Sequence, residues 1–469
     1  MSDSAHTSTE TLNVDVAVIG WGKGGKTLAA TLGAQGKNIA MIEEFEDMQG
    51  GTCINIGCVP TKTLIHDSEM ARAQQSDSET AAQAWSRAVD RRDALIGKLR
   101  NVNHHMLADI PSVTLVSGRG RFTGPKDIEV ANQGNTLQVH AETIIINTGA
   151  LPVMPKIPGI DSSRVHNSTT IQHVSPRPDS LLVVGAGPIG LEFASMFAGF
   201  GTQVTVADRG ERVLPREDED VAASVAGVLA DSGVNVINGA EVQSISEDGS
   251  VELSIAGQAE TRQFDAILFA TGRRPATDDL GLEAAGVELT ERGAVKVDEY
   301  LHTNVDGIFA IGDVTGGQQQ TYLSLDDFRV VLDQLTGKTE AEGARRKTDR
   351  VAVPATIFIT PALSSVGITE TQAREEGRDI KVAVQEVAKI KAMPRPKAVN
   401  DPRGLIKFVV DASTDEILGA RLFHVDSQEV INLVALAMRA GFTATQLKNG
   451  IWTHPSSTEA LNETLGQLK

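Results

Sequence analysis

The stretch Val14-Asp-Val-Ala-Val-Ile-Gly20-Trp-Gly22-Lys-Gly-Gly25 decides the fold of this chain. A short apolar run ends in the pattern G-x-G-x-x-G, and an alanine-rich helical pattern follows directly. In this arrangement the first glycine makes the turn, the second lets the backbone approach a pyrophosphate, and the third lets the helix pack on the strand. The helix N-terminus then offers N–H groups to phosphate oxygens. The stretch therefore predicts a dinucleotide-binding βαβ unit.

The same pattern occurs a second time. Leu181–Gly185 is an apolar run that continues into Gly-Ala-Gly-Pro-Ile-Gly190. Each copy is followed by a helical pattern and then by a second apolar run, at Ile39–Ile42 and at Val204–Ala207. Two βαβ units at this distance predict an α/β fold with two Rossmann-like dinucleotide-binding domains and parallel sheets.

An acidic residue follows the second predicted strand of each unit, Glu43 in the first and Asp208 in the second. At this position a carboxylate can bind the hydroxyl groups of a nucleotide ribose. Asp208 would accept from a free 2′-hydroxyl and repel a 2′-phosphate, which favours NADH. Arg209 follows at once and could instead bind that phosphate, so NADPH stays open. A solvated turn residue is the simpler interpretation of Arg209.

The C-terminal part has a different pattern. From about Val353, apolar stretches that include Leu405–Val410 and Ile417–Phe423 predict an antiparallel sheet. Residues 429–439 have the spacing of an amphipathic helix. We therefore expect an α+β C-terminal domain, and a chain of 469 residues is long enough for two to four domains.

Charge and hydropathy exclude several partners. The formal net charge of −18 repels phosphate backbones and anionic lipid surfaces, so we expect neither nucleic acid nor membrane as a partner. No apolar run is long enough to span a bilayer. The first twelve residues lack the charged-then-apolar pattern of an export signal. We therefore expect a soluble protein of the cytoplasm.

The chain has only two cysteines, and both lie in Gly50-Gly-Thr-Cys53-Ile-Asn-Ile-Gly57-Cys58-Val-Pro-Thr-Lys62. On an ideal helix, residues five apart have Cα atoms about 8.6 Å apart, whereas a disulfide needs less than about 7 Å. A bond between the cysteines therefore requires a locally distorted turn, and Gly57 supplies backbone freedom for it. In a cytoplasmic protein such a pair indicates redox chemistry more than structural cross-linking.

The segment Cys53–Lys62 resembles the redox-active disulfide signature of the class I pyridine nucleotide–disulfide oxidoreductases, which include glutathione reductase, dihydrolipoamide dehydrogenase and mercuric reductase. The resemblance implies that the first glycine unit binds FAD and the second NADH or NADPH. It implies that electrons pass from NAD(P)H through FAD to the cysteine pair. It also implies a discontinuous FAD-binding domain (1–150 and 273–345), an NAD(P)-binding domain (151–272) and a dimerisation domain (346–469).

The resemblance assigns roles to single residues. Cys53 would attack the substrate, and Cys58 would face the flavin. Lys62 and Glu192 match a Lys–Glu pair near the flavin N5. Without the resemblance, Glu192 is simply an acid in the first turn of a helix, where the helix dipole favours it.

A second catalytic group is expected near the C-terminus. The run from Thr453 to Glu459 resembles the His-Pro-Thr segment of the family, in which His454 would be the general base and Glu459 its orienting partner. Thiol exchange needs a group that gives and takes protons near neutral pH, and imidazole does so. In the family this base serves the cysteines of the other subunit, which implies a homodimer.

The cofactor-binding residues are expected among the glycines and polar side chains of these motifs. Thr303–Asp313 resembles the second flavin motif of the family, in which the Asp contacts the ribityl chain. The residues expected to bind FAD are Gly20, Gly22, Gly25, Glu43, Gly51, Thr52, Thr148, Gly149, Gly312 and Asp313. The residues expected to bind NAD(P) are Gly185, Gly187, Gly190, Asp208, Arg209 and Gly272.

The absence of further cysteine motifs, together with three characteristic sequence runs, narrows the class of substrate. With two cysteines, the chain has neither the N-terminal Cys-x-x-Cys module nor the C-terminal thiol pair found in some relatives. The runs Cys53–His66, Leu214–Asp218 and Thr315–Asp327 are similar to those of the bacterial reactive-chlorine-resistance flavoproteins, a subgroup associated with reduction of hypothiocyanous acid and Cu(II). We therefore expect an oxidative-stress reductase for a small oxidant.

Three other functions stay open. Dihydrolipoamide dehydrogenase is the first alternative, and a reductase of a small thiol disulfide such as mycothione or glutathione disulfide is the second. A redox sensor that binds flavin without turnover is the third. His104, His105 and Met106 could form a soft copper site, but adjacent residues on a helix point in different directions, so we expect no metal site.

Overall fold

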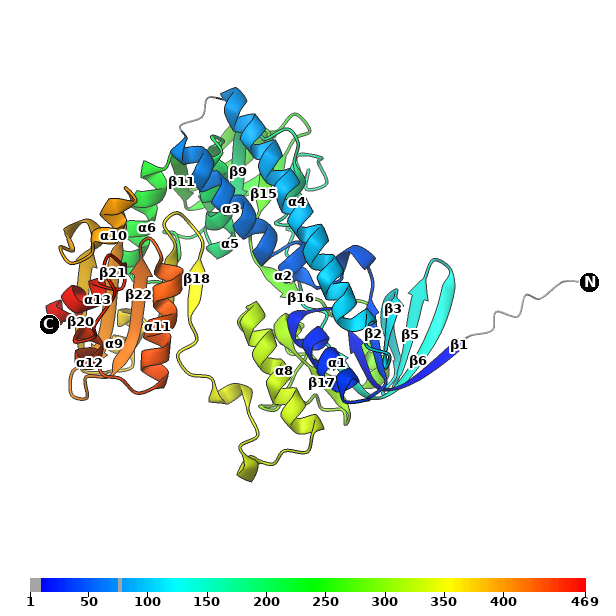
Figure 1. The fold of residues 1–469 in the computed structure, drawn as a ribbon. Helices are drawn as coiled ribbons and strands as arrows, with labels where there is room; N and C mark the ends of the chain where they lie inside the picture. The colour runs from blue at the N-terminus through cyan, green and yellow to red at the C-terminus, as the bar shows by residue number, and fades with distance from the viewer. Residues whose placement is uncertain (1–9, 75–77) are drawn as a thin grey trace, which may run out of the picture. The chain divides into compact units, whose positions relative to one another are not determined.

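The computed structural model describes residues 10–74 and 78–469, and the chain divides into two compact units (Figure 1). The first unit comprises the described part of Met1–Thr61 together with Asp90–Val153 and Arg273–Arg350. The second comprises the described part of Lys62–Val89 together with Met154–Gly272 and Val351–Lys469. The division into three domains proposed from the sequence stays a prediction.

The first unit is built on a seven-stranded sheet in the order β3-β2-β1-β6-β5-β4, with β17 added beside β6. The pairs β1–β2, β2–β3, β1–β6 and β6–β17 are parallel, as the glycine motifs predict. The strands are β1 (Glu10–Ile19), β2 (Ile39–Glu43), β3 (Val113–Ser117), β4 (Arg119–Gly124), β5 (Asp127–Asn132), β6 (Asn135–Ile146) and β17 (Ile308–Ala310).

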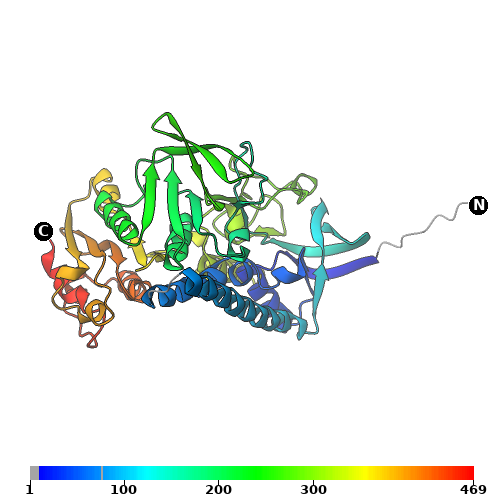
Figure 2. The same ribbon diagram turned by 90° about the horizontal axis from the view of Figure 1, so that it is seen from above.

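One side of this sheet is antiparallel, which was not predicted from the sequence. Strands β4, β5 and β6 form an antiparallel meander, whose strands follow one another in cyan in Figure 2. The β5–β6 hairpin turns at Gln133 and Gly134, which both have left-handed φ angles, of 46° and 87°. Two successive left-handed residues match the twist of a two-residue hairpin, so the chain reverses there instead of crossing over.

The second unit contains a five-stranded parallel sheet in the order β11-β10-β9-β15-β8. This is the parallel sheet that the second glycine motif predicts. A separate three-stranded antiparallel sheet, β12-β13-β14, was not predicted. The strands are β8 (Val165–His166), β9 (Ser180–Val184), β10 (Gln203–Asp208), β11 (Val234–Asn238), β12 (Ala240–Ile245), β13 (Ser250–Ile255), β14 (Gln258–Gln263) and β15 (Ala266–Phe269).

The C-terminal segment of the second unit forms an antiparallel sheet in the order β18-β19-β22-β21-β20, as predicted. Helix α11 lies beside β22 (Figure 1) and buries Val430, Ile431 and Val434 in the same apolar cluster as Ile406 and Leu422. The strands are β18 (Ala355–Ile357), β19 (Leu363–Gly367), β20 (Ile380–Glu386), β21 (Leu405–Asp411) and β22 (Ile417–Phe423). The predicted α/β fold class with an α+β C-terminal part is confirmed.

The helices cover these sheets, and a short pair of strands, β7 (Ala150–Pro152) and β16 (Arg273–Pro275), adds a small antiparallel ladder. No helix within residues 10–74 and 78–469 has the length and apolar content needed to cross a bilayer. The helices are α1 (Lys23–Ala34), α2 (Thr52–Asn55), α3 (Cys58–Ala73), α4 (Ser78–Ala108), α5 (Pro188–Gly199), α6 (Glu219–Asp231), α7 (Leu282–Ala285), α8 (Thr321–Leu335), α9 (Glu370–Glu375), α10 (Pro394–Ala398), α11 (Ser427–Arg439), α12 (Ala444–Lys448) and α13 (Ala460–Thr464).

A buried charge cluster joins α6 to the C-terminal sheet within the second unit. The side chain of Lys407 on β21 is 3% exposed, and its Nζ lies 3.1 Å from Asp218, 2.9 Å from Asp220 and 2.8 Å from Glu370. Asp218 also accepts from the backbone N–H groups of Glu370 and Thr371, both at 3.0 Å. Burial alone would raise the pKa of Asp218, but these hydrogen bonds and Lys407 lower it to about 2.

Asp218→Asn should lower the free energy of unfolding by about 2 kcal/mol at pH 7, because the folded state holds the carboxylate better than the unfolded chain does. The pKa is depressed in the folded protein, so this contribution is complete above about pH 4 and declines as the pH falls toward 2. Urea denaturation at pH 7 and pH 3 measures it, with the exposed Asp161→Asn as control. An equal loss at both pH values would contradict the assignment.

Candidate active site

The first glycine motif forms a tight turn between β1 and α1. Gly20 has a left-handed φ of 94°, and a Cβ atom there would lie 2.5 Å from the carbonyl oxygen of Asn147. The Asn147 side chain accepts from the Gly25 N–H at 3.0 Å and donates to the Ile311 carbonyl at 3.0 Å. Asn147, which was not predicted as a site residue, therefore ties this turn to the segment that enters Gly312. A polar residue at a strand end, just before Thr148-Gly149, is the signal that could have found it.

The acids that end the second strand of each βαβ motif, Glu43 in β2 and Asp208 in β10, occupy the same place in both. Glu43 Oε2 accepts from the Trp21 N–H at 3.0 Å, and Asp208 Oδ2 accepts from the Ala186 N–H at 2.7 Å. Trp21 and Ala186 are the first variable residues of the two G-x-G-x-x-G patterns. Burial raises the pKa of Glu43, and the hydrogen bond from Trp21 opposes this rise. Both acids thus hold their turns, and their contact with a ribose stays a prediction.

The second glycine motif has the geometry that its spacing predicts. Gly185 has a left-handed φ of 112°, and a Cβ atom on Gly190 would lie 2.0 Å from the Gly185 carbonyl oxygen. Gly187, at the N-terminus of α5, has open space where a Cβ atom would be. The helix can therefore approach the strand, and the turn leaves room for a phosphate group.

Arg209 forms an ion pair on the surface. Its guanidinium lies 2.5 Å from Glu241 Oε1, and its side chain is 76% exposed. An exposed ion pair of this kind contributes little stability. The arrangement agrees with the simpler interpretation of Arg209 as a solvated turn residue, and its contact with NAD(P) stays a prediction.

The second flavin segment lies beside the first glycine turn in the same unit. The Gly312 N–H donates to Asp327 Oδ2 at 2.7 Å, and the Gly24 N–H donates to Ser324 Oγ at 3.1 Å. Burial raises the pKa of Asp313 to about 6, although the charge of Arg273 opposes the rise. Ser324 and Asp327 on α8 were not predicted, and their signal is polarity within an otherwise apolar helix face.

Further glycines that were predicted to bind a cofactor have open space beside their backbone. Gly149 and Gly272 both have left-handed φ angles, of 77° and 130°, with open space where a Cβ atom would be. Thr148 Oγ1 donates to the Ala276 carbonyl at 2.7 Å. The first unit thus combines a glycine turn, open backbone and a buried carboxyl, which fits a dinucleotide with a hydroxyl-rich chain such as FAD.

The two cysteines lie on either side of a break between helices. Helix α2 ends at Asn55 and α3 begins at Cys58, so the distorted turn that a disulfide would need is present. The Gly57 N–H reaches back to the Thr52 carbonyl at 2.7 Å. From the sequence, Gly57 was expected to supply backbone freedom for this turn. Its φ is not left-handed, and a Cβ atom would lie 3.0 Å from Thr52 O, so a side chain there would crowd the turn.

Cys53 and Cys58 are free thiols that interact with each other, and the thiol of Cys58 has the largest influence on the pKa of Cys53. This influence raises the pKa of Cys53, and burial and the charge of Cys58 raise it further. Thr321 and the charge of Lys26 act in the opposite direction. Cys58 is exposed, and its Sγ lies 3.6 Å from Thr321 Oγ1. The two sulfur atoms are therefore close enough for dithiol chemistry, in which one thiol is more accessible than the other.

Lys62 and Glu192 form a close ion pair in the second unit. Lys62 Nζ lies 2.6 Å from Glu192 Oε2, with side-chain exposures of 31% and 12%. Glu192 also accepts from the Phe358 N–H at 2.8 Å, and the Lys62 ammonium lies 4.7 Å from the centre of the Phe358 ring. The structure thus brings the predicted pair together, and its role beside the flavin stays a prediction.

His454 and Glu459 are also in contact. His454 Nδ1 lies 2.9 Å from Glu459 Oε1, and the Ser456 N–H donates to Glu459 Oε2 at 2.8 Å. The hydrogen bond with His454 lowers the pKa of Glu459. The imidazole is 71% exposed, so its other nitrogen can face a partner molecule. The carboxylate orients the ring through Nδ1, which is the arrangement of a His–acid pair in acid–base catalysis.

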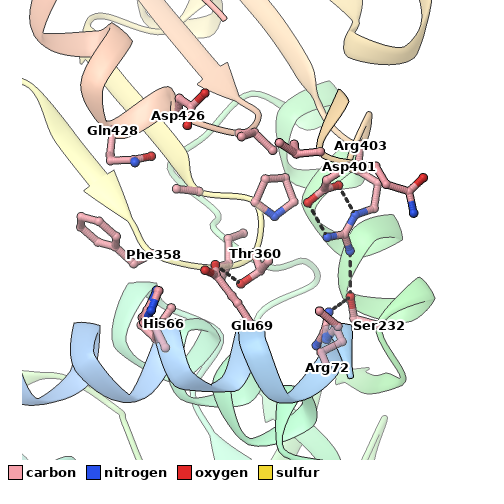
Figure 3. A pocket seen from close by; sticks show the side chains of 18 of the residues that line it. His66, Glu69, Arg72, Ser232, Phe358, Thr360, Asp401, Arg403, Asp426 and Gln428 are labelled. Atoms are coloured by element: carbon pink, nitrogen blue, oxygen red, sulfur yellow. Dashed lines mark hydrogen bonds and ion pairs between the residues drawn. The ribbon is translucent and has the colours of Figure 1, made fainter. Parts of the chain in front are cut away.

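A cavity of about 1060 Å³ in the second unit was not predicted. Its walls come from α3, the segment after β18 and the loop that contains Arg403 (Figure 3). Arg72 and Arg403 both donate to the Ser232 hydroxyl, at 3.0 and 3.2 Å, and Asp401 holds Arg403 through two oxygens. Acidic groups thus balance the cationic ones along this wall.

His104 and His105 on α4 each form a hydrogen bond with a nearby side chain. His104 Nδ1 lies 2.9 Å from Gln49 Oε1, and His105 Nδ1 lies 3.1 Å from Asp109 Oδ1. Across residues 10–74 and 78–469, no group of three or more His, Cys, Asp or Glu side chains is placed to hold a metal ion. Each imidazole has a local partner of its own on or near the helix.

Glycine turns, open backbone and a thiol pair in one unit define a dithiol oxidoreductase that uses dinucleotides. Residues 14–327 match the pyridine nucleotide-disulphide oxidoreductase family, and residues 353–465 match the dimerisation domain of that family. The chain belongs to this family, as the cysteine segment predicted. It is therefore a flavoprotein that uses a pyridine nucleotide, and the second match supports a homodimer.

Similar proteins are known in several bacteria. The probable pyridine nucleotide-disulfide oxidoreductase RclA of Escherichia coli is 45% identical over 96% of this chain and 98% of its own. A mercuric reductase of Lysinibacillus sphaericus is 32% identical over 96% of this chain and 81% of its own. A dihydrolipoyl dehydrogenase of Corynebacterium glutamicum is 33% identical over 97% of both.

The fold also matches solved structures. The Cu(II) complex of the HOCl-induced flavoprotein disulfide reductase RclA from Escherichia coli has a TM-score of 0.90 and 45% identity, covering 97% of this chain and 99% of that one. Another structure of the HOCl-induced flavoprotein disulfide reductase RclA from Escherichia coli has a TM-score of 0.88 and covers 96% of this chain and 99% of that one. These likenesses agree with the subgroup that the sequence runs indicated.

Gly51→Ala should release flavin and lower stability by more than about 1 kcal/mol, because Gly51 has a left-handed φ of 81° and a Cβ atom would lie 2.6 Å from the Trp21 carbonyl oxygen. Flavin absorbance per protein and urea denaturation measure both effects. Gly97→Ala in α4 is the control, since nothing lies within 4 Å of that position. The control should keep its flavin and gain roughly 0.5 kcal/mol. Full flavin content in Gly51→Ala would refute this account of the turn.

Proposed function

We propose that this protein is an NAD(P)H-dependent reductase of oxidative-stress defence that passes electrons through Cys53 and Cys58 to a small oxidant. The observation that carries the proposal is the placement of two free, interacting thiols on either side of the α2–α3 break. Hypothiocyanous acid and Cu(II) are the proposed acceptors. The 45% identity to RclA, described as HOCl-induced and solved as a Cu(II) complex, supports this choice.

The roles of the cysteines follow from their surroundings. When bound, FAD would take a hydride from NAD(P)H and deliver the electron pair that opens the disulfide. Cys58 is proposed as the thiol that faces the flavin, because it lies near Arg273, Asp313 and Tyr322, whose pKa values respond to its charge. Cys53 is proposed as the thiol that attacks the oxidant.

With hypothiocyanous acid the chemistry balances. The Cys53 thiolate attacks the oxidant sulfur, a sulfur–sulfur bond forms, and hydroxide leaves as the sulfur–oxygen bond breaks. A proton from His454 converts the hydroxide to water. The Cys58 thiolate then attacks the Cys53 sulfur, expels thiocyanate and restores the disulfide. One NADH and one hypothiocyanous acid thus give NAD⁺, thiocyanate and water, whereas Cu(II) would consume two ions per NADH.

The same proposal covers the subunit partner, the residues beside the flavin, the choice of nucleotide and the location. His454, oriented by Glu459, is proposed to serve the cysteines of the other subunit of a homodimer. Lys62 and Glu192 are proposed to lie beside the flavin. The Asp208 carboxylate, with Arg209 occupied by Glu241, favours NADH over NADPH. A reducing compartment keeps such a thiol pair active, so the cytoplasm is the proposed location.

Steady-state oxidation of NADH and NADPH against hypothiocyanous acid, Cu(II), lipoamide, glutathione disulfide and mycothione tests the substrate. The proposal predicts at least tenfold higher kcat/KM for hypothiocyanous acid or Cu(II) than for any disulfide, and a preference for NADH. Rapid NAD-coupled oxidation of dihydrolipoamide beside negligible oxidant turnover would replace the proposal with a dihydrolipoamide dehydrogenase; the chain is 33% identical to the dihydrolipoyl dehydrogenase of Corynebacterium glutamicum. Flavin binding without NADH oxidation by any acceptor would indicate a sensor.

His454→Ala should slow turnover of hypothiocyanous acid about 100-fold, because the leaving hydroxide loses its proton donor. Glu459→Gln should have a smaller effect in the same direction, since the imidazole loses its charged partner. Reduction of the enzyme by NADH should be unchanged in both, which stopped-flow absorbance measures. His140→Ala removes a similar exposed His–Asp pair, with Nδ1 2.8 Å from Asp127, and should leave both steps unchanged. Equal turnover in His454→Ala and wild type would exclude the role.

A further inference from the structure

Lys26 is a buried lysine at a position where a positive charge is unfavourable. It follows the last glycine of the first motif, in the first turn of α1, where the helix dipole disfavours a cation. Its side chain is buried, with 3% exposure. Burial and the nearby Lys23 lower the pKa of its ammonium to about 8. A buried cation that both the helix and its neighbour oppose needs compensating contacts.

Those contacts lead to the cysteine turn. Lys26 Nζ donates to the Gly50 carbonyl at 2.9 Å and to Asn103 Oδ1 at 2.5 Å. Gly50 precedes Gly51, which is the N-cap residue of α2, and α2 contains Cys53. The ammonium thus holds the start of the helix that positions one thiol. The bond to Asn103 fastens the same group to α4.

The charge of Lys26 also acts on Cys53. The negative charge of a Cys53 thiolate raises the pKa of Lys26, and the charge of Lys26 lowers the pKa of Cys53. The two effects are reciprocal, as linkage between two charged groups requires. Hydrogen bonding to Cys58, burial and the charge of Cys58 all disfavour the Cys53 thiolate. Lys26 is therefore the cation that acts against them within the described part of the first unit.

Other titratable groups nearby act on the second thiol. The pKa values of three of them respond to the charge of Cys58, and none of the three is among the largest influences on the pKa of Cys53. Thr321 touches Cys58 and lowers the pKa of Cys53 through a hydrogen bond, but it carries no charge. The groups that respond to Cys58 are Arg273, Asp313 and Tyr322.

We propose that Lys26 is a positioning residue of the reaction: its ammonium fixes the Gly50–Gly51 turn and stabilises the thiolate of Cys53. This inference rests on the proposed role of Cys53 as the attacking thiol. It separates the tasks of the two cysteines, because one thiolate depends on a buried protein cation and the other on the groups around the flavin segment. A lysine that were only a structural anchor would leave the acidity of Cys53 unchanged.

The test uses the FAD-loaded homodimer with Cys58→Ser, in which Cys53 is the single cysteine. The rate of Cys53 alkylation by iodoacetamide is measured against pH, with and without Lys26→Met. Lys26→Met should slow alkylation about tenfold at pH 7, a shift of about one pKa unit. The two rates should converge at pH values above both thiol pKa values, because the thiolate is then fully formed in each variant.

Asn103→Asp is the second variant, and Lys37→Met is the control. The new carboxylate next to Lys26 should weaken its effect on Cys53 and slow alkylation at pH 7 while the turn stays anchored. Lys37 is exposed, so removing its charge should change nothing. Identical pH profiles with and without Lys26, or the same slowing at every pH, would overturn the inference. Cys53 that resists alkylation at all pH values in the Cys58→Ser parent would instead contradict its proposed role as the attacking thiol.

Discussion

The break between α2 and α3 is the constraint on which the redox site depends. A continuous helix would hold the two cysteines too far apart to bond. The chain therefore ends one helix at Asn55, closes a bond from Gly57 to Thr52 and begins the next helix at Cys58. The two free thiols then lie near enough to influence each other. A Cβ atom on Gly57 would lie 3.0 Å from the Thr52 carbonyl oxygen, so a side chain there would crowd the turn between the cysteines.

The surroundings of this turn are tied together by side chains from distant parts of the first unit. Asn147 bridges the first glycine turn and the segment before Gly312, and Ser324 binds the N-terminus of α1. Lys26 reaches from α1 to Gly50 at the start of the cysteine turn. The first glycine motif, which is proposed to bind the dinucleotide, and the turn that holds the thiols are therefore one connected structure, which suits electron transfer between a bound flavin and a thiol pair.

Local patterns predicted much of this protein, and long-range contacts did not follow from them. Local sequence was enough to predict the two glycine motifs, the cysteine turn and the His454–Glu459 pair, because each is formed by residues close in sequence. The antiparallel meander of β4–β6 was missed, since its turn at Gln133 lacks a common hairpin sequence. Asn147 and Lys26 were missed because their partners lie 122 residues and 77 residues away. No periodicity indicates such pairs.

Anaerobic titration of the FAD-loaded protein with NADH tests the central claim, that electrons reach a flavin-facing thiol. The account predicts that one equivalent of NADH exposes two alkylatable thiols per flavin, Cys53 and Cys58. It predicts a long-wavelength absorbance band from a thiolate against the flavin, absent in Cys58→Ser and present in Cys53→Ser. Bleaching of the flavin without new thiols, or a band that persists in Cys58→Ser, would contradict it.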